Sequence, residues 1–142
     1  MDDERAIRLL CRINLGLAGM EVLEATDGAE GLAAARKEHP DLILLDVMMP
    51  DVDGWQVARE LARDEATRDI PIVFLTARAE RVDELRGYET GAVGYITKPF
   101  DPVWLGNFLR SVIERVERGE GDELRAEQLR RLRAPDEPGL DA

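Results

Sequence analysis

The chain has 142 residues, a formal net charge of −11 and one cysteine. This length suits a single domain, and no apolar run approaches the roughly 20 residues that a membrane-spanning helix needs. The acidic charge argues against direct nucleic-acid binding, so we expect the partners to be proteins or a cation. A lone cysteine excludes an internal disulfide and fits the reducing cytoplasm, so we expect a cytoplasmic protein.

The first forty residues predict two helices and a strand. A helical pattern runs over residues 4–18 and ends at Gly19, a residue type common just past a helix end. Residues 20–25 (MEVLEA) are predicted to form a strand. Asp27 is a good cap for the next helix, which Pro40 should end.

The segment DLILLDVMMPDVDG, from Asp41 to Gly54, is the centre of the predicted fold. Its residues 42–45 are wholly apolar, which is typical of a buried parallel strand. Asp46 follows this strand directly, at the edge where open α/β sheets bind their ligands. A helical pattern then starts near Trp55.

Two further short strands are predicted, one leading to Thr76 and one delivering Lys98. Helices are expected over residues 79–90 and after Asp101. Alternating strands and helices predict a parallel sheet with right-handed crossovers. We expect one domain over residues 1–118 and a charged, flexible tail over residues 119–142, where Leu124, Leu129 and Leu132 could alternatively support a short helix.

The predicted strand ends bring different polar groups to one edge of the sheet. Asp46, Thr76 and Lys98 each follow a strand, and Asp2 and Asp3 stand just before the first helix. Three carboxylates cannot stay ionised together without a cation, and Mg²⁺ suits a few carboxylates plus water and phosphate oxygen. This set predicts a phosphoryl site in which the carboxylate attacks phosphorus.

The same segments resemble the receiver domain of two-component response regulators. The matching motifs are DDE at residues 2–4, LLDVMMPDVDG around Asp46, FLTA ending at Ala77 and GYITKPF at residues 94–100. The resemblance implies a flavodoxin-like, doubly wound parallel sheet with strand order 2-1-3-4-5. It also implies a phosphorylation-dependent signalling switch whose phosphoryl donor is a phosphohistidine on a histidine kinase or phosphotransfer protein. No turnover of an external substrate is implied, so we do not expect an enzyme.

The resemblance further implies how Mg²⁺ and the phosphoryl group are held. Asp46 would be the phosphoacceptor. The ligands of Mg²⁺ would be Asp3, Asp46 and the backbone carbonyl of Met48, with Asp2 acting through water. The phosphoryl group would be contacted by Thr76, Lys98 and the backbone of Ala77.

A switch and a partner surface are implied in the same way. Thr76 and Tyr95 would couple phosphorylation to the face between Ala79 and Val116, which could bind a downstream protein or a second copy. The Lys98–Pro99 bond is expected to be cis, because the chain must turn at once while Lys98 points back at the site.

The chain departs from the receiver pattern at its start, where only Met1 precedes the acidic pair. Receivers place an apolar strand there, in the middle of the sheet. We therefore expect strand 1 to be missing, with four strands and a gap that is weakly ordered or filled by another chain.

Two other functions stay open. A degenerate receiver would be a protein-binding module that works without phosphorylation, and the missing strand favours it. A phosphatase with an aspartyl nucleophile would carry a second carboxylate two residues after Asp46, where this chain has Met48.

Overall fold

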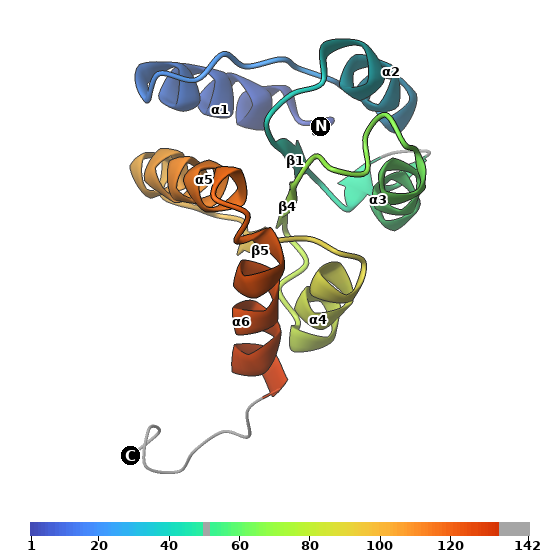
Figure 1. Ribbon diagram of the computed structural model, residues 1–142. Helices are drawn as coiled ribbons and strands as arrows, with labels where there is room; N and C mark the ends of the chain where they lie inside the picture. Colours follow the sequence, from blue (N-terminus) through green and yellow to red (C-terminus); the bar gives the residue numbers. More distant parts are fainter. Residues whose placement is uncertain (50–51, 134–142) are drawn as a thin grey trace.

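The computed structural model describes residues 1–49 and 52–133. Within these ranges helices and short strands alternate along the chain (Figure 1). In order they are α1 (Arg5–Leu17), α2 (Gly28–Glu38), β1 (Ile43–Leu45), β2 (Met48–Met49), β3 (Val52–Asp53), α3 (Gly54–Arg63), β4 (Ile72–Thr76), α4 (Arg81–Glu89), β5 (Gly94–Thr97), α5 (Pro102–Glu117) and α6 (Gly121–Arg133).

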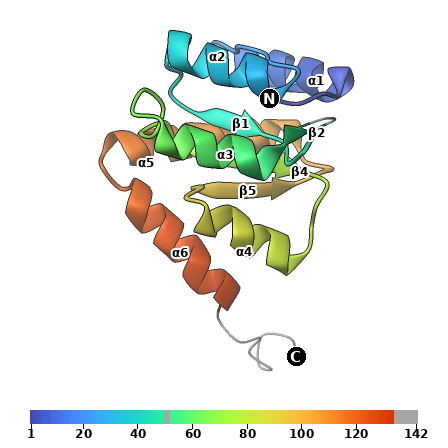
Figure 2. The same ribbon diagram turned by 90° about the vertical axis from the view of Figure 1, so that its right-hand side faces the viewer.

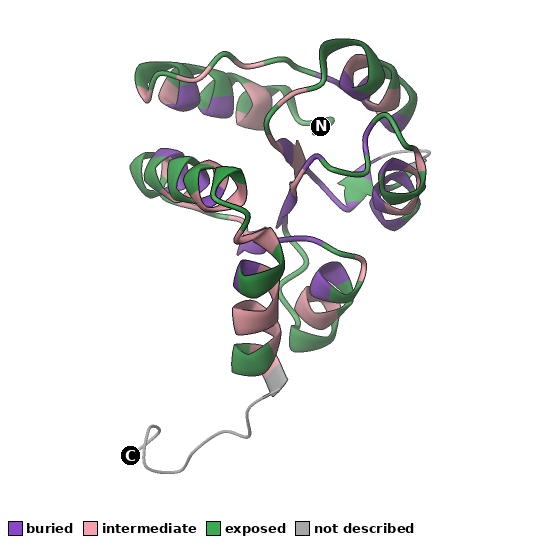
Figure 3. Cartoon of the chain, in the orientation of Figure 1, coloured by how far each residue is buried: buried purple, intermediate pink, exposed green. Residues whose placement is uncertain are grey.

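The described part of the chain contains a three-stranded parallel sheet in the order β1-β4-β5. Helices cover both faces of this sheet, with α1 and α5 on one side and α3 and α4 on the other (Figures 1 and 2). All residues of the central strand β4 are therefore buried, and Figure 3 shows burial concentrated on the sheet and on the inward sides of the helices. The predicted α/β fold, a doubly wound parallel sheet, is confirmed.

Successive residues of β4 belong alternately to two separate apolar cores. Phe74 packs with Trp55 and Tyr95 on the side of α3 and α4. Val73 and Leu75 pack against α1 and α5 on the opposite side. This alternation follows from the two-residue period of a strand, and it makes β4 the element on which both layers rest.

The strand expected over residues 20–25 does not form, so the parallel sheet has three strands where four were predicted. The segment is irregular, and it meets the start of the chain only where Asp2 N donates to Ala25 O at 3.1 Å. A strand needs a ladder of backbone hydrogen bonds to a neighbouring strand. The single bond from Asp2 N to Ala25 O does not make such a ladder. The expected gap is present as a cavity of about 490 Å³ between residues 20–25 and β1.

The tail also differs from expectation, because Gly121–Arg133 form the helix α6. Leu124 is buried, and Leu129 and Leu132 pack against the core on the side of α4. Arg125 Nε donates to Tyr88 O at 2.9 Å, which ties α6 to α4. An apolar stripe on a charged sequence was thus enough to dock a helix; residues 134–142 lie outside the described part of the tail. None of the described helices is both long and apolar enough to cross a membrane.

Candidate functional site

Asp46 lies immediately after β1 and is almost completely buried, with 3% of its surface exposed. Its Oδ1 accepts a hydrogen bond of 2.9 Å from Met48 N, which fixes the side chain at the start of the following loop. Its own N–H donates to Met1 O at 3.0 Å. The carboxylate is therefore presented at the carboxyl end of the sheet, as predicted for a strand-end residue.

Lys98 follows β5 and reaches across the same edge. Its Nζ lies 2.9 Å from Asp46 Oδ2, 2.9 Å from Asp2 Oδ2 and 3.0 Å from Glu4 Oε1. Burial opposes the positive charge, but the hydrogen bonds that Lys98 donates to three carboxylates outweigh it and hold the pKa of Lys98 above its ordinary value. Lys98 is thus a fixed cation at the centre of an acidic group.

The acidic group consists of Asp2, Glu4 and Asp46, whose nearest carboxylate oxygens lie within 4.8 Å of one another. Burial raises the pKa of Asp2 because its carboxylate is desolvated, and the hydrogen bond from Lys98 offsets only part of that effect. Hard oxygen donors at this spacing are the ligands that Mg²⁺ prefers, so the residues present fit that ion. Glu4 was not among the predicted ligands, although it belongs to the DDE motif at residues 2–4.

Asp3 does not join this group. Its side chain is exposed and lines a shallow hollow that also includes Met48, Asp53 and Arg78. Asp2 takes the buried position because its backbone N–H is bound to Ala25 O and its Oδ1 accepts from Glu4 N at 2.9 Å. The role of the Met48 carbonyl stays a prediction, and the Met48 side chain is half exposed.

Thr76 ends β4 beside Lys98. Its side chain is fully buried, and its Oγ1 accepts from Arg78 N at 3.3 Å. Lys98 N donates to Thr76 O at 2.8 Å, which holds the ends of β4 and β5 together. Ala77, the next residue, is exposed at the same edge. The structure therefore brings Asp46, Thr76 and Lys98 to one edge of the sheet.

Tyr95 lies on β5 with its ring packed inward. The ring centroid is 5.9 Å from that of Phe74, and the hydroxyl donates to Arg78 O at 2.8 Å. A Cβ at position 87 would come within 2.7 Å of the ring, so Gly87 makes room for it. Burial raises the pKa of Tyr95. The Lys98–Pro99 bond beyond this strand is cis.

The comparisons with known proteins agree on a family. The family model for the response regulator receiver domain matches residues 1–110. The chain is 45% identical over 83% of its length to the DNA-binding dual master transcriptional regulator RpaA of Synechocystis, covering 49% of that protein. It is 46% identical over 86% of its length to the phosphate regulon transcriptional regulatory protein PhoB of Pseudomonas aeruginosa, covering 52%. The chain thus spans about half the length of these curated relatives.

Solved structures give the same result. The chemotaxis protein CheY4 of Vibrio cholerae is 35% identical, with a TM-score of 0.73 over 78% of this chain and 92% of that one. A CheY-like receiver domain protein of Methanospirillum hungatei is 26% identical, with a TM-score of 0.76 over 83% and 93%. Phosphorylation within two-component systems and Mg²⁺ binding at an acidic cluster are typical of such domains. The chain therefore belongs to the family of response regulator receiver domains.

Proposed function

We propose that this chain is a phosphorylation-dependent signalling switch that accepts a phosphoryl group on Asp46. The donor is a phosphohistidine of a histidine kinase or phosphotransfer protein. The observation that carries this proposal is the contact of a buried strand-end carboxylate with Lys98, at 2.9 Å, beside the buried hydroxyl of Thr76.

The chemistry follows from the roles that these side chains can take. An Asp46 oxygen attacks phosphorus and forms a P–O bond while the P–N bond to the donor histidine breaks. Lys98 Nζ and the Thr76 hydroxyl then donate hydrogen bonds to the phosphoryl oxygens, helped by the backbone N–H of Ala77. Burial of Asp46 and Thr76 makes these contacts stronger than they would be in open water.

Mg²⁺ would be held at the same edge, and when bound it would offset the negative charge of the phosphoryl oxygens. The geometry supports Asp46, Asp2 and Glu4 as its carboxylate ligands. The Met48 carbonyl remains a proposed ligand, and Asp3, which is exposed, is the weakest of the set. Lys98 must then share Asp46 with the ion.

The direct test is incubation with acetyl phosphate and Mg²⁺ followed by intact-mass measurement. A labile mass increase of one phosphoryl group, removed by hydroxylamine, supports the proposal. An unmodified chain would instead favour the binding module that works without phosphorylation. Rapid release of free phosphate without an adduct would point to a phosphatase.

The proposed output surface comprises α4, β5 and α5, between Ala79 and Val116. The docked helix α6 contacts both α4 and α5, so a downstream protein or a second copy must bind beside it or displace it. The net charge of −11 supports a surface for proteins rather than for DNA, although one relative is named as DNA-binding. The free Cys11 fits a cytoplasmic location.

A further inference from the structure

The ammonium group of Lys98 is fully engaged before any phosphoryl group arrives. An ammonium carries three N–H donors, and Nζ of Lys98 lies 2.9 Å from Asp46 Oδ2, 2.9 Å from Asp2 Oδ2 and 3.0 Å from Glu4 Oε1. The proposed phosphoryl transfer needs one of these donors for a phosphoryl oxygen. One of the three carboxylates must therefore give up its contact with Lys98 during the reaction.

Burial and anchoring distinguish the three carboxylates. The Asp46 and Asp2 side chains are 3% and 9% exposed, whereas the Glu4 side chain is 56% exposed. Asp46 Oδ1 is fixed by Met48 N, and Asp2 Oδ1 is fixed by Glu4 N, each at 2.9 Å. Glu4 precedes α1, but its side chain makes no capping hydrogen bond. An exposed ion pair is weak, so Glu4 is the carboxylate that leaves Lys98 most easily.

Asp46 cannot release Lys98 while the phosphoryl group approaches. It must stay ionised until its bond to phosphorus forms, because the anion is the nucleophile. The approaching group is itself negatively charged and meets three carboxylates at one edge of the sheet. Its oxygens therefore need a hydrogen-bond donor before the new bond exists, and only an exchange on Lys98 supplies the ammonium for this purpose.

Mg²⁺ does not by itself make this exchange unnecessary. Glu4 holds Lys98 through Oε1, so its other carboxylate oxygen can bind the ion without releasing Lys98. Replacement of Glu4 on Lys98 is thus a step separate from binding of the ion.

We propose that Glu4 is a positioning residue that occupies the place of a phosphoryl oxygen on Lys98 and is displaced by that oxygen during transfer. Glu4 acts through Lys98, which it keeps at the site, and its competition for the ammonium slows phosphorylation. This inference rests on the proposed phosphorylation of Asp46, and it adds a residue that sets the rate of that reaction.

Two substitutions separate the contact from the charge. Glu4→Gln removes the charge and keeps the length of the side chain. Glu4→Asp keeps the charge but is one methylene shorter, which withdraws the carboxylate from Lys98. Both should fold like the parent, because the main-chain bond from Arg8 N to Glu4 O remains and Asp is a favoured residue before a helix.

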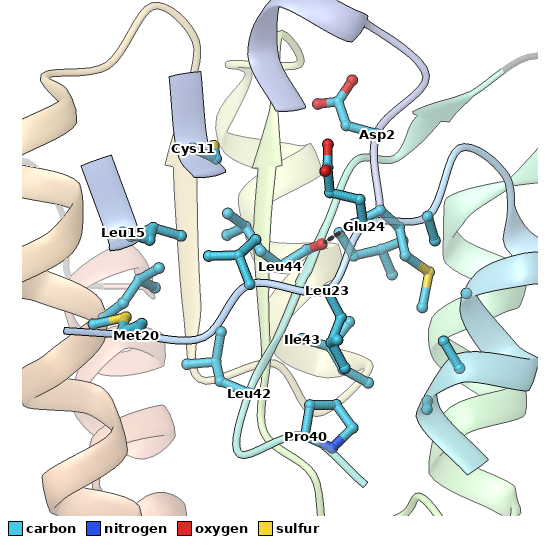
Figure 4. Close-up of a pocket in the computed structure, with 18 of the residues that line it drawn as sticks. Asp2, Cys11, Leu15, Met20, Leu23, Glu24, Pro40, Leu42, Ile43 and Leu44 are labelled. Carbon is cyan, nitrogen blue, oxygen red and sulfur yellow. Dashed lines mark hydrogen bonds between the residues drawn. The ribbon is translucent and has the colours of Figure 1, made fainter. Parts of the chain in front are cut away.

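Glu24→Gln is the matched control. Figure 4 shows Glu24 and Asp2 at the same end of the cavity between residues 20–25 and β1. Glu24 is paired with Arg8 and Arg12 rather than with Lys98, at 3.7 and 3.5 Å. This variant removes the same charge near the site and leaves the ammonium of Lys98 as it was.

The first experiment measures the initial rate of adduct formation with acetyl phosphate, at Mg²⁺ concentrations that saturate each full-length variant. We expect Glu4→Gln and Glu4→Asp each to react about two- to fivefold faster than the parent, the range for loss of an exposed ion pair. Glu24→Gln should react like the parent. Unchanged rates in both Glu4 variants would overturn the proposal. Acceleration in Glu4→Gln alone would also overturn it, because the effect would then be one of charge.

The second experiment uses inorganic phosphate and Mg²⁺ without a phosphodonor, so it does not depend on phosphorylation of Asp46. The ¹³C signal of the Glu4 carboxyl carbon, assigned by its loss in Glu4→Gln, should shift as phosphate binds to the parent. Phosphate should bind about two- to fivefold more tightly to both Glu4 variants. An unshifted Glu4 signal, equal affinities or no phosphate binding to any chain would each refute displacement of Glu4. Absence of an adduct in every chain would instead refute phosphorylation of Asp46, and the phosphate titration would still decide the role of Glu4.

Discussion

Lys98 Nζ lies 2.9 Å from Asp46 Oδ2, so the lysine neutralises the same carboxylate that we propose as phosphoacceptor. Asp2 and Glu4 contact the same nitrogen. The site is therefore an acidic group with one internal cation, and its response to mutation should depend on whether Mg²⁺ is present.

Replacing Lys98 with Met should destabilise the chain in the absence of Mg²⁺. Removing one partner of a buried ion pair leaves the other charge uncompensated, which costs about 3 kcal/mol. Mg²⁺ should restore part of this loss, because it supplies the missing positive charge. Urea unfolding with and without Mg²⁺ measures both effects. Lys37→Met, on the exposed end of α2, should change neither; equal losses for the two variants would contradict the assignment.

Asp46→Asn should abolish the adduct formed with acetyl phosphate. The amide keeps the shape of the side chain and removes the nucleophilic oxygen anion. The matched control is Asp41→Asn, an exposed residue two positions before β1, which should label like the parent. Intact-mass measurement detects the adduct in both variants, and undiminished labelling of the Asp46→Asn chain would contradict the role of Asp46 as phosphoacceptor.

The two leading carboxylates should contribute unequally to Mg²⁺ binding. Asp2 is buried within the acidic group, whereas Asp3 is exposed outside it. Asp2→Asn should therefore weaken Mg²⁺ binding by about tenfold, and Asp3→Asn should weaken it less. Isothermal titration calorimetry measures the two constants; a larger loss for Asp3→Asn would restore the assignment implied by the family resemblance.

Thr76→Ala should permit phosphorylation but reduce the change that it causes at Tyr95. Thr76 is fully buried, its hydroxyl accepts from Arg78 N, and the Tyr95 hydroxyl donates to Arg78 O. Moving the Thr76 hydroxyl toward a phosphoryl oxygen would disturb the backbone of Arg78, which both side chains contact. Amide chemical shifts of α4 and β5 report the change. Thr97→Ala, the neighbour of Thr76 on β5, is the control, and unaltered shifts in the Thr76 variant would place the coupling elsewhere.

Alkaline pH should destabilise the chain through its two tyrosines. Burial raises the pKa of Tyr88 to about 12, and burial also raises that of Tyr95. Both folded values lie above the ordinary value of 10.0, so the unfolded chain releases protons first. The contribution of the two protonated tyrosines to the free energy of unfolding is complete below about pH 10 and is lost as pH rises toward 12. The raised pKa of Lys98 makes stability depend on pH in the same direction.

Phenolate absorbance and urea unfolding across this range test the pH prediction. Native tyrosines should ionise well above the tyrosines of the urea-unfolded chain. Tyr88→Phe should flatten part of the pH dependence of the free energy of unfolding. Identical titration curves for folded and unfolded chains would refute it.

The sequence alone determined the sheet from β1 onward and the convergence of its polar strand ends. Apolar runs without alternation mark buried parallel strands wherever they occur, and the carboxyl ends of parallel strands necessarily share one edge. Asp46, Thr76 and Lys98 could therefore be placed together with no knowledge of long-range contacts.

Only the tertiary structure decided the features that depend on distant partners. Residues 20–25 have the composition of a strand, but within the described chain they meet the start of the chain only where Asp2 N donates to Ala25 O, so they stay irregular. Adjacent acids in the DDE motif look equivalent until the Met1 and Asp2 hydrogen bonds turn Asp2 inward and leave Asp3 exposed. The apolar stripe of α6 became a docked helix because α4 presents Tyr88 and its surroundings to it. Local pattern specifies a strand or a buried face, whereas pairing and orientation require the contact itself.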